Sequence, residues 1–229
     1  MAVYVTGDTH GNLNIFFGVE YSKITGKDYV IIAGDAGILF SKNSDKYWHN
    51  LSLLKLLAFK VLWVDGNHEN HDWIDSLPVS TWNGGKIHKI TENCYHLMRG
   101  QIYNIDGNTL FTFGGANSID KDMRVPGLSW WEREIPSFNE ENEGLDNLEK
   151  VGNKVDYIIT HDCPSNILYK INPTYNNYSV TKYLFEIDKN VDFKHWYFGH
   201  HHFDKTFDQK HTVLYSELVK LGETITDSD

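Results

Sequence analysis

The sequence predicts an α/β fold in which short buried strands alternate with helices. Three observations lead to this expectation. Short apolar runs alternate with segments of helical character in the first third of the chain. Each run ends close to a glycine, and the same strand pattern returns from Tyr157 onward. A strand–helix–strand order favours parallel pairing of the strands through crossover helices.

The first third of the chain supplies the clearest elements. Three short apolar runs that end near a glycine are predicted to be buried strands: Ala2–Thr6, Tyr29–Ala33 and Lys60–Val64. The segments between them, Asn14–Ile24 and Asp45–Ala58, are predicted to be helices. The second of these carries apolar residues at helical spacing.

The middle of the chain has a different pattern. Short runs around glycine-containing turns predict strands at Tyr95–Leu97, Gln101–Ile105 and Thr109–Phe113. A loop rich in glycine, arginine and tryptophan covers residues 114–137. It leads into a predicted helix, Ser137–Lys150, whose acidic stretch at residues 140–143 is expected to be a solvated face. The strands expected after this helix are Tyr157–Thr160, His195–Phe198 and a closing hairpin of Phe203–Phe207 with Thr212–Tyr215.

Length and composition favour one packed domain over residues 1–229. The chain has 229 residues, of which 41% are hydrophobic and 23% charged, so a core is available and disorder is disfavoured. The net charge is −10, which repels phosphate backbones. General binding to DNA or RNA is therefore not expected, and the composition leaves the oligomeric state open.

Targeting and redox signals are weak. The residues before Asp8 contain no basic region and no long apolar stretch, and no run approaches the roughly 20 residues that span a bilayer. Cys94 and Cys163 fit neither a disulfide framework nor a zinc-finger spacing. These observations predict a cytoplasmic protein that does not associate with membranes.

Five short polar motifs stand where five predicted strands end. They are Gly7–Asn12, Gly34–Gly37, Gly66–Glu69, Thr160–Asp162 and Gly199–His202. Ligands of open α/β sheets bind at the carboxyl ends of the strands, so these motifs are expected to converge there. Glycine beside each motif lets the backbone turn tightly and approach a ligand closely.

The side chains in these motifs are metal ligands by type. Asp8 and His10 are two residues apart, so in an extended segment both side chains face the same way. His200 and His202 repeat this spacing, and His201 is expected to point elsewhere. Carboxylate, imidazole and amide ligands without thiolate favour manganese, iron, zinc or cobalt, with manganese preferred, and disfavour calcium.

The five motifs together resemble the calcineurin-like metallophosphoesterase superfamily, and in particular its small bacterial and phage members. The pattern of that superfamily is Asp-x-His, Gly-Asp-x, Gly-Asn-His-Glu, His and Gly-His-x-His, in the order found here between Gly7 and His202. The resemblance implies a β-sandwich flanked by helices, in α/β/β/α layers. It also implies a metal-dependent hydrolase of phosphoric esters, either a phosphodiesterase or a phosphomonoesterase.

The resemblance assigns a role to each motif residue. Asp8, His10 and His202 would hold one divalent ion. Asn67, His161 and His200 would hold the other, and Asp35 would bridge both. His68 would contact the scissile phosphate and protonate the leaving oxygen. Two ions about 3.5–4 Å apart can activate a bridging hydroxide, which attacks phosphorus in line with the leaving group.

The second motif departs from that of the protein Ser/Thr phosphatases in the superfamily. Those enzymes continue it as Gly-Asp-x-x-Asp-Arg-Gly, whereas residues 34–40 here lack the second aspartate and the arginine. A small phosphoester, such as a nucleotide or a cyclic nucleotide, is therefore the favoured substrate class. The alternatives are a protein phosphatase, a nuclease, or a non-catalytic scaffold with the same fold. The departure leaves the group that orients His68 unassigned.

The 114–137 loop has two interpretations. Trp130 or Trp131 could stack on a base while Arg124 or Arg133 grips a phosphate. Alternatively, the tryptophans pack a long loop onto the core. The chain's other histidines (His49, His71, His88, His96, His195 and His211) are expected to be hydrogen-bonded structural residues, and Cys163 a small buried one.

Overall fold

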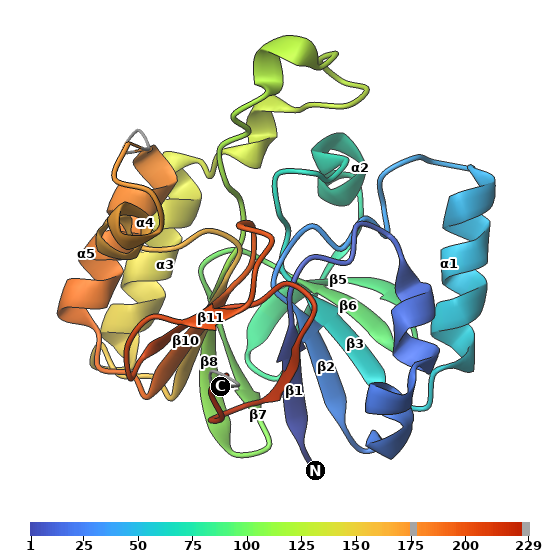
Figure 1. The fold of residues 1–229 in the computed structure, drawn as a ribbon, viewed down its shortest axis with the longest axis horizontal. Helices are drawn as coiled ribbons and strands as arrows, with labels where there is room; N and C mark the ends of the chain where they lie inside the picture. Colours follow the sequence, from blue (N-terminus) through green and yellow to red (C-terminus); the bar gives the residue numbers. More distant parts are fainter. Residues whose placement is uncertain (175–177, 226–229) are drawn as a thin grey trace.

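The computed structural model describes residues 1–174 and 178–225, and it contains two β-sheets with helices on their outer faces (Figure 1). The first sheet has seven strands in the order β13-β1-β2-β3-β6-β5-β4. Strands β1, β2, β3 and β6 are parallel, and β13, β5 and β4 join antiparallel at the two sides. Their bounds are β1 Val3–Thr6, β2 Tyr29–Ile32, β3 Lys60–Trp63, β4 Val79–Trp82, β5 Gly85–Thr91, β6 Cys94–Leu97 and β13 Leu218–Lys220.

The second sheet has six strands in the order β11-β12-β10-β9-β8-β7. Its central strands β8, β9, β10 and β12 are parallel, and β7 and β11 are antiparallel to their neighbours. The strands are β7 Gln101–Ile105, β8 Asn108–Phe113, β9 Tyr157–Thr160, β10 His195–Phe198, β11 Lys205–Thr206 and β12 His211–Val213.

Helices cover the outer face of each sheet. Over the first sheet lie α1 (Asp45–Leu56), α2 (His71–Asp75) and the 3-10 turns η1 (Leu13–Phe17) and η2 (Val19–Lys23). Over the second lie α3 (Phe138–Lys150), α4 (Ser165–Ile171) and α5 (Ser179–Asn190). None of the helices in these described segments is long and apolar enough to cross a membrane.

The core explains this layering through the two-residue period of the strands. Ile31 of β2 and Ile159 of β9 point between the sheets and belong to one apolar cluster. Their neighbours Ile32 and Ile158 point outward, one under α1 and the other under α3 to α5. Strands that are apolar on both faces need cover on both sides. The predicted α/β/β/α sandwich is therefore confirmed.

Most predicted elements are present, and two expectations were wrong. The segment Asn14–Ile24 is not one helix, because Gly18 adopts an extended conformation (φ −70°, ψ 164°) and divides it into η1 and η2. The acidic stretch of α3 is not simply solvated. Glu140 completes a capping box with Ser137 and pairs with Arg133, and Glu143 pairs with Lys86.

The loop after β8 forms an arm, residues 115–134, that stands above the carboxyl ends of the strands (Figure 1). It contains two short 3-10 turns, η3 (Lys121–Met123) and η4 (Glu132–Glu134). Ile119, Met123 and Leu128 on it are 68–84% exposed. The buried base of the arm ends in Glu134, whose backbone carbonyl accepts a hydrogen bond from Arg99.

Candidate metal centre

Both sheets contribute to one cluster at the carboxyl ends of their strands. Asp8 and Asp35 follow β1 and β2, and Asn67 lies just beyond β3, all in the first sheet. His161 follows β9 directly, and the residues 200–202 follow β10, both in the second sheet. The sequence-predicted ligands are therefore brought together by strand register and not by any single loop.

Four of the predicted ligands have a left-handed backbone. The φ angles are 46° at His10, 46° at Asp35, 69° at His200 and 54° at His202. Non-glycine residues rarely adopt this conformation, and such strain is concentrated at functional sites. The remaining non-glycine residues with positive φ in the described chain are asparagines and an aspartate (Asn43, Asn83, Asp106 and Asn153).

Two glycines let the backbones close around this cluster. A Cβ on Gly34 would lie 2.0 Å from Nδ1 of His161, and one on Gly199 would lie 2.3 Å from Oδ1 of Asp8. Any side chain at these positions would push a predicted ligand away. These two glycines are thus explained by contacts across the two sheets.

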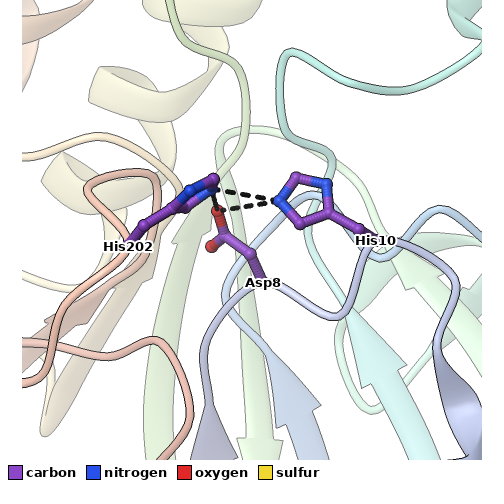
Figure 2. Close-up of side chains that lie close together, drawn as sticks. All are labelled: Asp8, His10 and His202. Atoms are coloured by element: carbon purple, nitrogen blue, oxygen red, sulfur yellow. Dashed lines mark hydrogen bonds and ion pairs between the residues drawn. The ribbon is translucent and has the colours of Figure 1, made fainter.

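Asp8, His10 and His202 form the first group of predicted ligands (Figure 2). Nε2 of His202 lies 3.1 Å from Asp8 Oδ2 and 3.0 Å from Nε2 of His10. The hydrogen bond to Asp8 raises the pKa of His202. Burial opposes ionisation of Asp8, but its contacts with His202, His161 and His200 lower its pKa overall. The ligand atoms of all three residues lie within 4.8 Å of one another.

Asp35, His161 and Asn67 form the second group. Nδ1 of His161 donates to the backbone carbonyl of Ala33 at 2.9 Å, which leaves Nε2 without its own proton in the neutral ring. This Nε2 faces Oδ1 of Asn67 at 3.0 Å and Oδ1 of Asp35 at 3.5 Å. Acceptors that face one another at this distance are stabilised by a cation or a proton.

The charges of this group are only partly neutralised by the protein. Burial and the nearby charge of Asp8 raise the pKa of Asp35 to about 6. Burial opposes protonation of His161, but the carboxylates of Asp35 and Asp8 raise its pKa. Oδ2 of Asp35 is buried and has no hydrogen-bond partner, whereas Oδ2 of Asp8 is contacted by His202 and, at 3.8 Å, by His10. Unpaired buried carboxylate oxygens beside imidazole nitrogens fit a divalent cation.

His200 lies beside His161, with their ring centroids 4.9 Å apart. Its backbone N–H donates to Asp8 Oδ1 at 3.0 Å, and burial lowers the pKa of its ring to about 3. A neutral imidazole is the form that binds a metal. His201 turns away from this cluster, and its Nε2 lies 3.5 Å from Asp162 Oδ1 and from the Cys163 sulfur.

The orientation of Asn67 is set by residues that sequence reasoning missed. Its Nδ2 donates to the Ser118 hydroxyl at 3.0 Å, and this hydroxyl donates to Glu134 at 2.6 Å. The backbone N–H of Ser118 donates to the other oxygen of Glu134 at 2.8 Å. The base of the arm therefore turns Oδ1 of Asn67 toward the candidate metal position. No local sequence signal marks Ser118 or Glu134, because Ser118 lies 51 residues from Asn67 in the chain and Glu134 a further 16 residues on.

His68 lies at the edge of the cluster, where the arm reaches it. Its backbone N–H donates to Asp35 Oδ1 at 2.7 Å, and its ring lies 5.6 Å from that of His10. Nη2 of Arg124 approaches its Nε2 at 3.3 Å. Asp120 holds the same guanidinium through two hydrogen bonds of 2.7 Å. Burial and the charge of Arg124 lower the pKa of His68 to about 4.

The structure does not bring the other predicted substrate residues into the cluster. Trp131 is buried, and its Nε1 donates to Asp72 of α2 at 2.9 Å. Arg133 pairs with Asp75 at 3.1 Å and with Glu140 at 2.7 Å. Trp130 is half-buried within the arm, where its carbonyl accepts a hydrogen bond from Gly127. These contacts favour the packing interpretation of both tryptophans.

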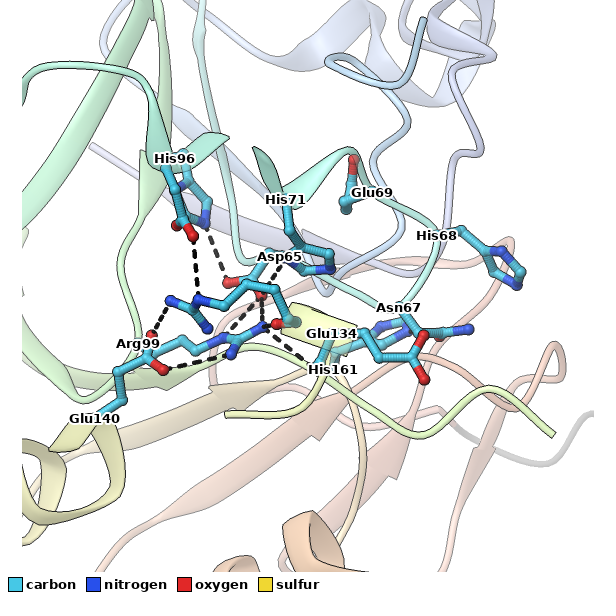
Figure 3. A network of polar contacts seen from close by, with 12 residues as sticks. Asp65, Asn67, His68, Glu69, His71, His96, Arg99, Glu134, Glu140 and His161 are labelled. Carbon is cyan, nitrogen blue, oxygen red and sulfur yellow. Dashed lines mark hydrogen bonds and ion pairs between the residues drawn. The ribbon is translucent and has the colours of Figure 1, made fainter. Parts of the chain in front are cut away.

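A second buried polar cluster lies directly behind the site (Figure 3). Asp65, two residues before Asn67, accepts from Nε of Arg99 at 2.8 Å and also from Nη2. Its other oxygen lies 3.1 Å from Nε2 of His96. Burial opposes ionisation, but the Arg99 guanidinium and the His96 hydrogen bond hold the pKa of Asp65 well below its usual value.

Among the remaining histidines, His88, His96, His195 and His211 have structural contacts, as the sequence suggested, whereas His49 is exposed on α1. His88 and His96 are buried and stacked, with their Nδ1 atoms 3.1 Å apart. His195 contacts Thr212 at 2.8 Å, and His211 contacts Asp208 at 3.0 Å. Burial raises the pKa of the Cys163 thiol well above its usual value, which disfavours a thiolate.

The fold and the cluster define a class: an α/β/β/α sandwich with carboxylates and histidines at the strand ends that could hold a metal ion. The model of the calcineurin-like phosphoesterase family matches residues 1–204, and the chain belongs to this family. The chain is also 27% identical over 187 residues to the lariat debranching enzyme of Schizosaccharomyces pombe. That alignment covers 73% of this chain and 38% of the relative, so the chain spans less than half of that protein's length.

Proposed function

We propose that the chain binds two divalent ions and hydrolyses a small phosphoric ester, with nucleotides and cyclic nucleotides as candidate substrates. The observation that carries this proposal is the cluster of two buried carboxylates, Asp8 and Asp35, in which one oxygen of Asp35 has no partner. The two carboxylates face histidines from the opposite sheet, at the position where ligands of such sheets bind. Family membership supports the same chemistry.

The proposed ligand sets follow the two groups of side chains. Asp8, His10 and His202 would hold one ion. His161, His200 and Asn67 would hold the other, with Asp35 between them. Bound ions would supply an activated water and neutralise charge on the transferred phosphoryl group. Manganese is the favoured ion, because the ligands are carboxylate, imidazole and amide without thiolate.

The remaining residues act on the substrate. His68 is proposed to protonate the leaving oxygen, and Arg124 to bind a non-bridging phosphate oxygen. The Arg124 guanidinium is the group that touches His68, so it also supplies the contact that the second motif left unassigned. A phosphate between them would offset the positive charge that disfavours protonation of His68.

The test of this mechanism is His68→Asn in the manganese-loaded protein. Removing a positioned general acid costs about 10²–10⁴-fold in rate. We expect that loss on nucleoside or alkyl esters and a smaller one on p-nitrophenyl esters, whose leaving group departs without a proton. Elemental analysis should find the same metal content as in the wild type. Undiminished turnover on a nucleoside ester with both metals bound would refute the role of His68.

The debranching relative suggests a second candidate activity. Because most of this chain aligns with that enzyme, a lariat substrate belongs in the hydrolysis screen beside phosphomonoesters, phosphodiesters and cyclic nucleotides. Hydrolysis of the lariat at a rate above that of all small esters would favour this candidate.

A further inference from the structure

Two cavities open at the candidate site, and they meet at His68 and Arg124. The first, of about 510 Å³, extends from His10 toward Phe40, Ser41 and Tyr47 on the side of α1. The second, of about 610 Å³, extends from Asn67 and His200 toward Ile119, Leu168 and Tyr178 on the side of α4 and α5. The first cavity is bordered by one predicted ligand, His10, and the second by four, Asp35, Asn67, His200 and His202, so both cavities open onto the same cluster.

Each cavity has the size and chemistry of a site for an organic group. Pockets of about 300–1,000 Å³ hold small organic ligands, and both volumes lie within this range. The first cavity combines the rings of Phe40 and Tyr47 with the hydroxyls of Ser41 and Ser44 and the ammonium of Lys46. The second combines Tyr178 and Phe203 with three aliphatic side chains and with polar side chains that include Asp120, Asp162 and Asn172. Aromatic walls with a few polar groups are typical of sites that bind nucleosides.

The junction between the cavities has the chemistry of a phosphate site. Arg124 borders both cavities, and Asp120 fixes its guanidinium in place. Asp120 occupies the Nε–Nη2 edge of this guanidinium, and an N–H group outside that edge can donate to a phosphate oxygen. A substrate that fills the whole site would therefore carry its phosphate at the junction and one organic group in each cavity.

We propose that the substrate is a linear phosphodiester with a nucleoside-sized group on each ester oxygen, an inference that rests on the proposed phosphoesterase activity. A monoester has one organic group and would leave one cavity to water. In a cyclic nucleotide both ester oxygens belong to one sugar, so it also occupies a single cavity. The net charge of −10 disfavours a long polyanion, which restricts the substrate to a short one.

The experiment compares four substrates on the manganese-loaded chain: a dinucleoside monophosphate, 3′,5′-cyclic AMP, AMP and p-nitrophenyl phosphate. We expect kcat/KM for the dinucleoside monophosphate to exceed that for cyclic AMP and AMP by at least about tenfold, because one more stacked base is bound. Equal or higher kcat/KM for AMP or cyclic AMP would overturn the inference and leave the phosphoesterase activity in place.

Two variants separate the cavities. Ser41→Trp fills the first and Ile119→Trp fills the second, and both residues are exposed. Each variant should lower kcat/KM for the dinucleoside monophosphate by about tenfold, since base stacking in one cavity is lost. The ratio of this kcat/KM to that for p-nitrophenyl phosphate should fall by a similar factor, since the small ester fits the cavity that stays open. If only one variant has an effect, the substrate carries one organic group and the inference fails.

The matched controls place the same side chain outside the cavities. Ser52→Trp on α1 and Met123→Trp on the arm change exposed residues that do not line either cavity, so both should behave as the wild type. Melting temperatures identify any variant that fails to fold. If the metal-loaded wild type hydrolyses no ester at all, the proposed function itself falls, and this inference falls with it.

Discussion

Two buried clusters of acids and histidines lie side by side in this protein and differ in one respect. In the cluster behind the site, the Arg99 guanidinium neutralises Asp65, whose pKa is held low. In the cluster at the strand ends, Asp35 has no such cation and its pKa is raised to about 6. Burial is similar in both, so the difference is the source of positive charge. A buried acid that the chain leaves without a cation marks a position for a bound one.

The largest expected change in stability is at the cluster behind the site, where Arg99 neutralises Asp65. Replacing Arg99 by Met leaves Asp65 buried without its partner, which should lower the free energy of unfolding by about 3–5 kcal/mol. Urea denaturation of the metal-free protein measures this change. The double variant Arg99→Met/Asp65→Asn should recover part of the loss, because no uncompensated charge remains.

The control for this prediction is an exposed ion pair. Lys89→Met removes the partner of Glu92 at the surface, where water screens the pair, and should change the free energy of unfolding far less than Arg99→Met does. If Arg99→Met is no more destabilising than Lys89→Met, the Arg99 guanidinium does not stabilise the cluster behind the site.

At the strand ends, by contrast, we expect a substitution to raise the free energy of unfolding of the metal-free protein. Asp35→Asn keeps the acceptor for the His68 backbone, and asparagine tolerates the left-handed conformation found there. It removes a buried charge, so the metal-free variant should be more stable than the wild type at pH 7 by about 2–3 kcal/mol, the value of a shift from about 3.9 to about 6. With manganese present, the variant should bind less metal and lose activity.

The pH dependence distinguishes this effect from a change in packing. The folded pKa of Asp35 lies above the unfolded value, so the metal-free native state binds more protons between pH 4 and pH 6. Wild-type stability should therefore fall relative to the variant as pH rises through this range and stay level above it. His161 and His202 titrate nearby, so the difference between the two proteins is the quantity to follow. A difference that is constant from pH 4 to pH 7 would contradict the prediction.

The smallest expected effect is at Ser118, which orients a predicted ligand without touching a metal. Ser118→Ala frees the Asn67 amide and should weaken manganese binding by about tenfold, the lower end for residues that position ligands. Titration of the metal-free protein with manganese measures the affinity directly. Ser118→Thr keeps the hydroxyl and should restore the affinity. Ser129→Ala, on the same arm, should have no effect, since its hydroxyl accepts from Val125.

The sequence predicted the layers and strand ends well because their signals are local. Short apolar runs, glycines and motif spacing lie within a few residues of one another, and the structure brings the motif side chains together as expected. Their roles as ligands and acid stay predictions. The break at Gly18 was missed because two short 3-10 turns have nearly the same apolar spacing as one helix.

What the sequence did not reveal depends on distant partners. The Asp65–Arg99 pair joins residues 34 positions apart, and Ser118 meets Asn67 across 51. Neither contact has a periodicity or a motif. The expectation of a solvated acidic face was wrong at Glu140 for the same reason. Its partners Arg99 and Arg133 come from other elements, so the sequence near Glu140 does not reveal them.

The division of the predicted ligands between the two sheets also bears on how the chain folds. Asp8, Asp35 and Asn67 belong to the first sheet, and the histidines from residue 161 onward belong to the second, so neither sheet alone presents a complete set. A folding intermediate with one sheet formed would bind ions weakly. An ion that binds only after the sheets have docked slows their separation without hastening their formation. Bound metal should therefore lengthen the lifetime of the native state. The unfolding rate then measures whether the ion is bound by ligands from both sheets.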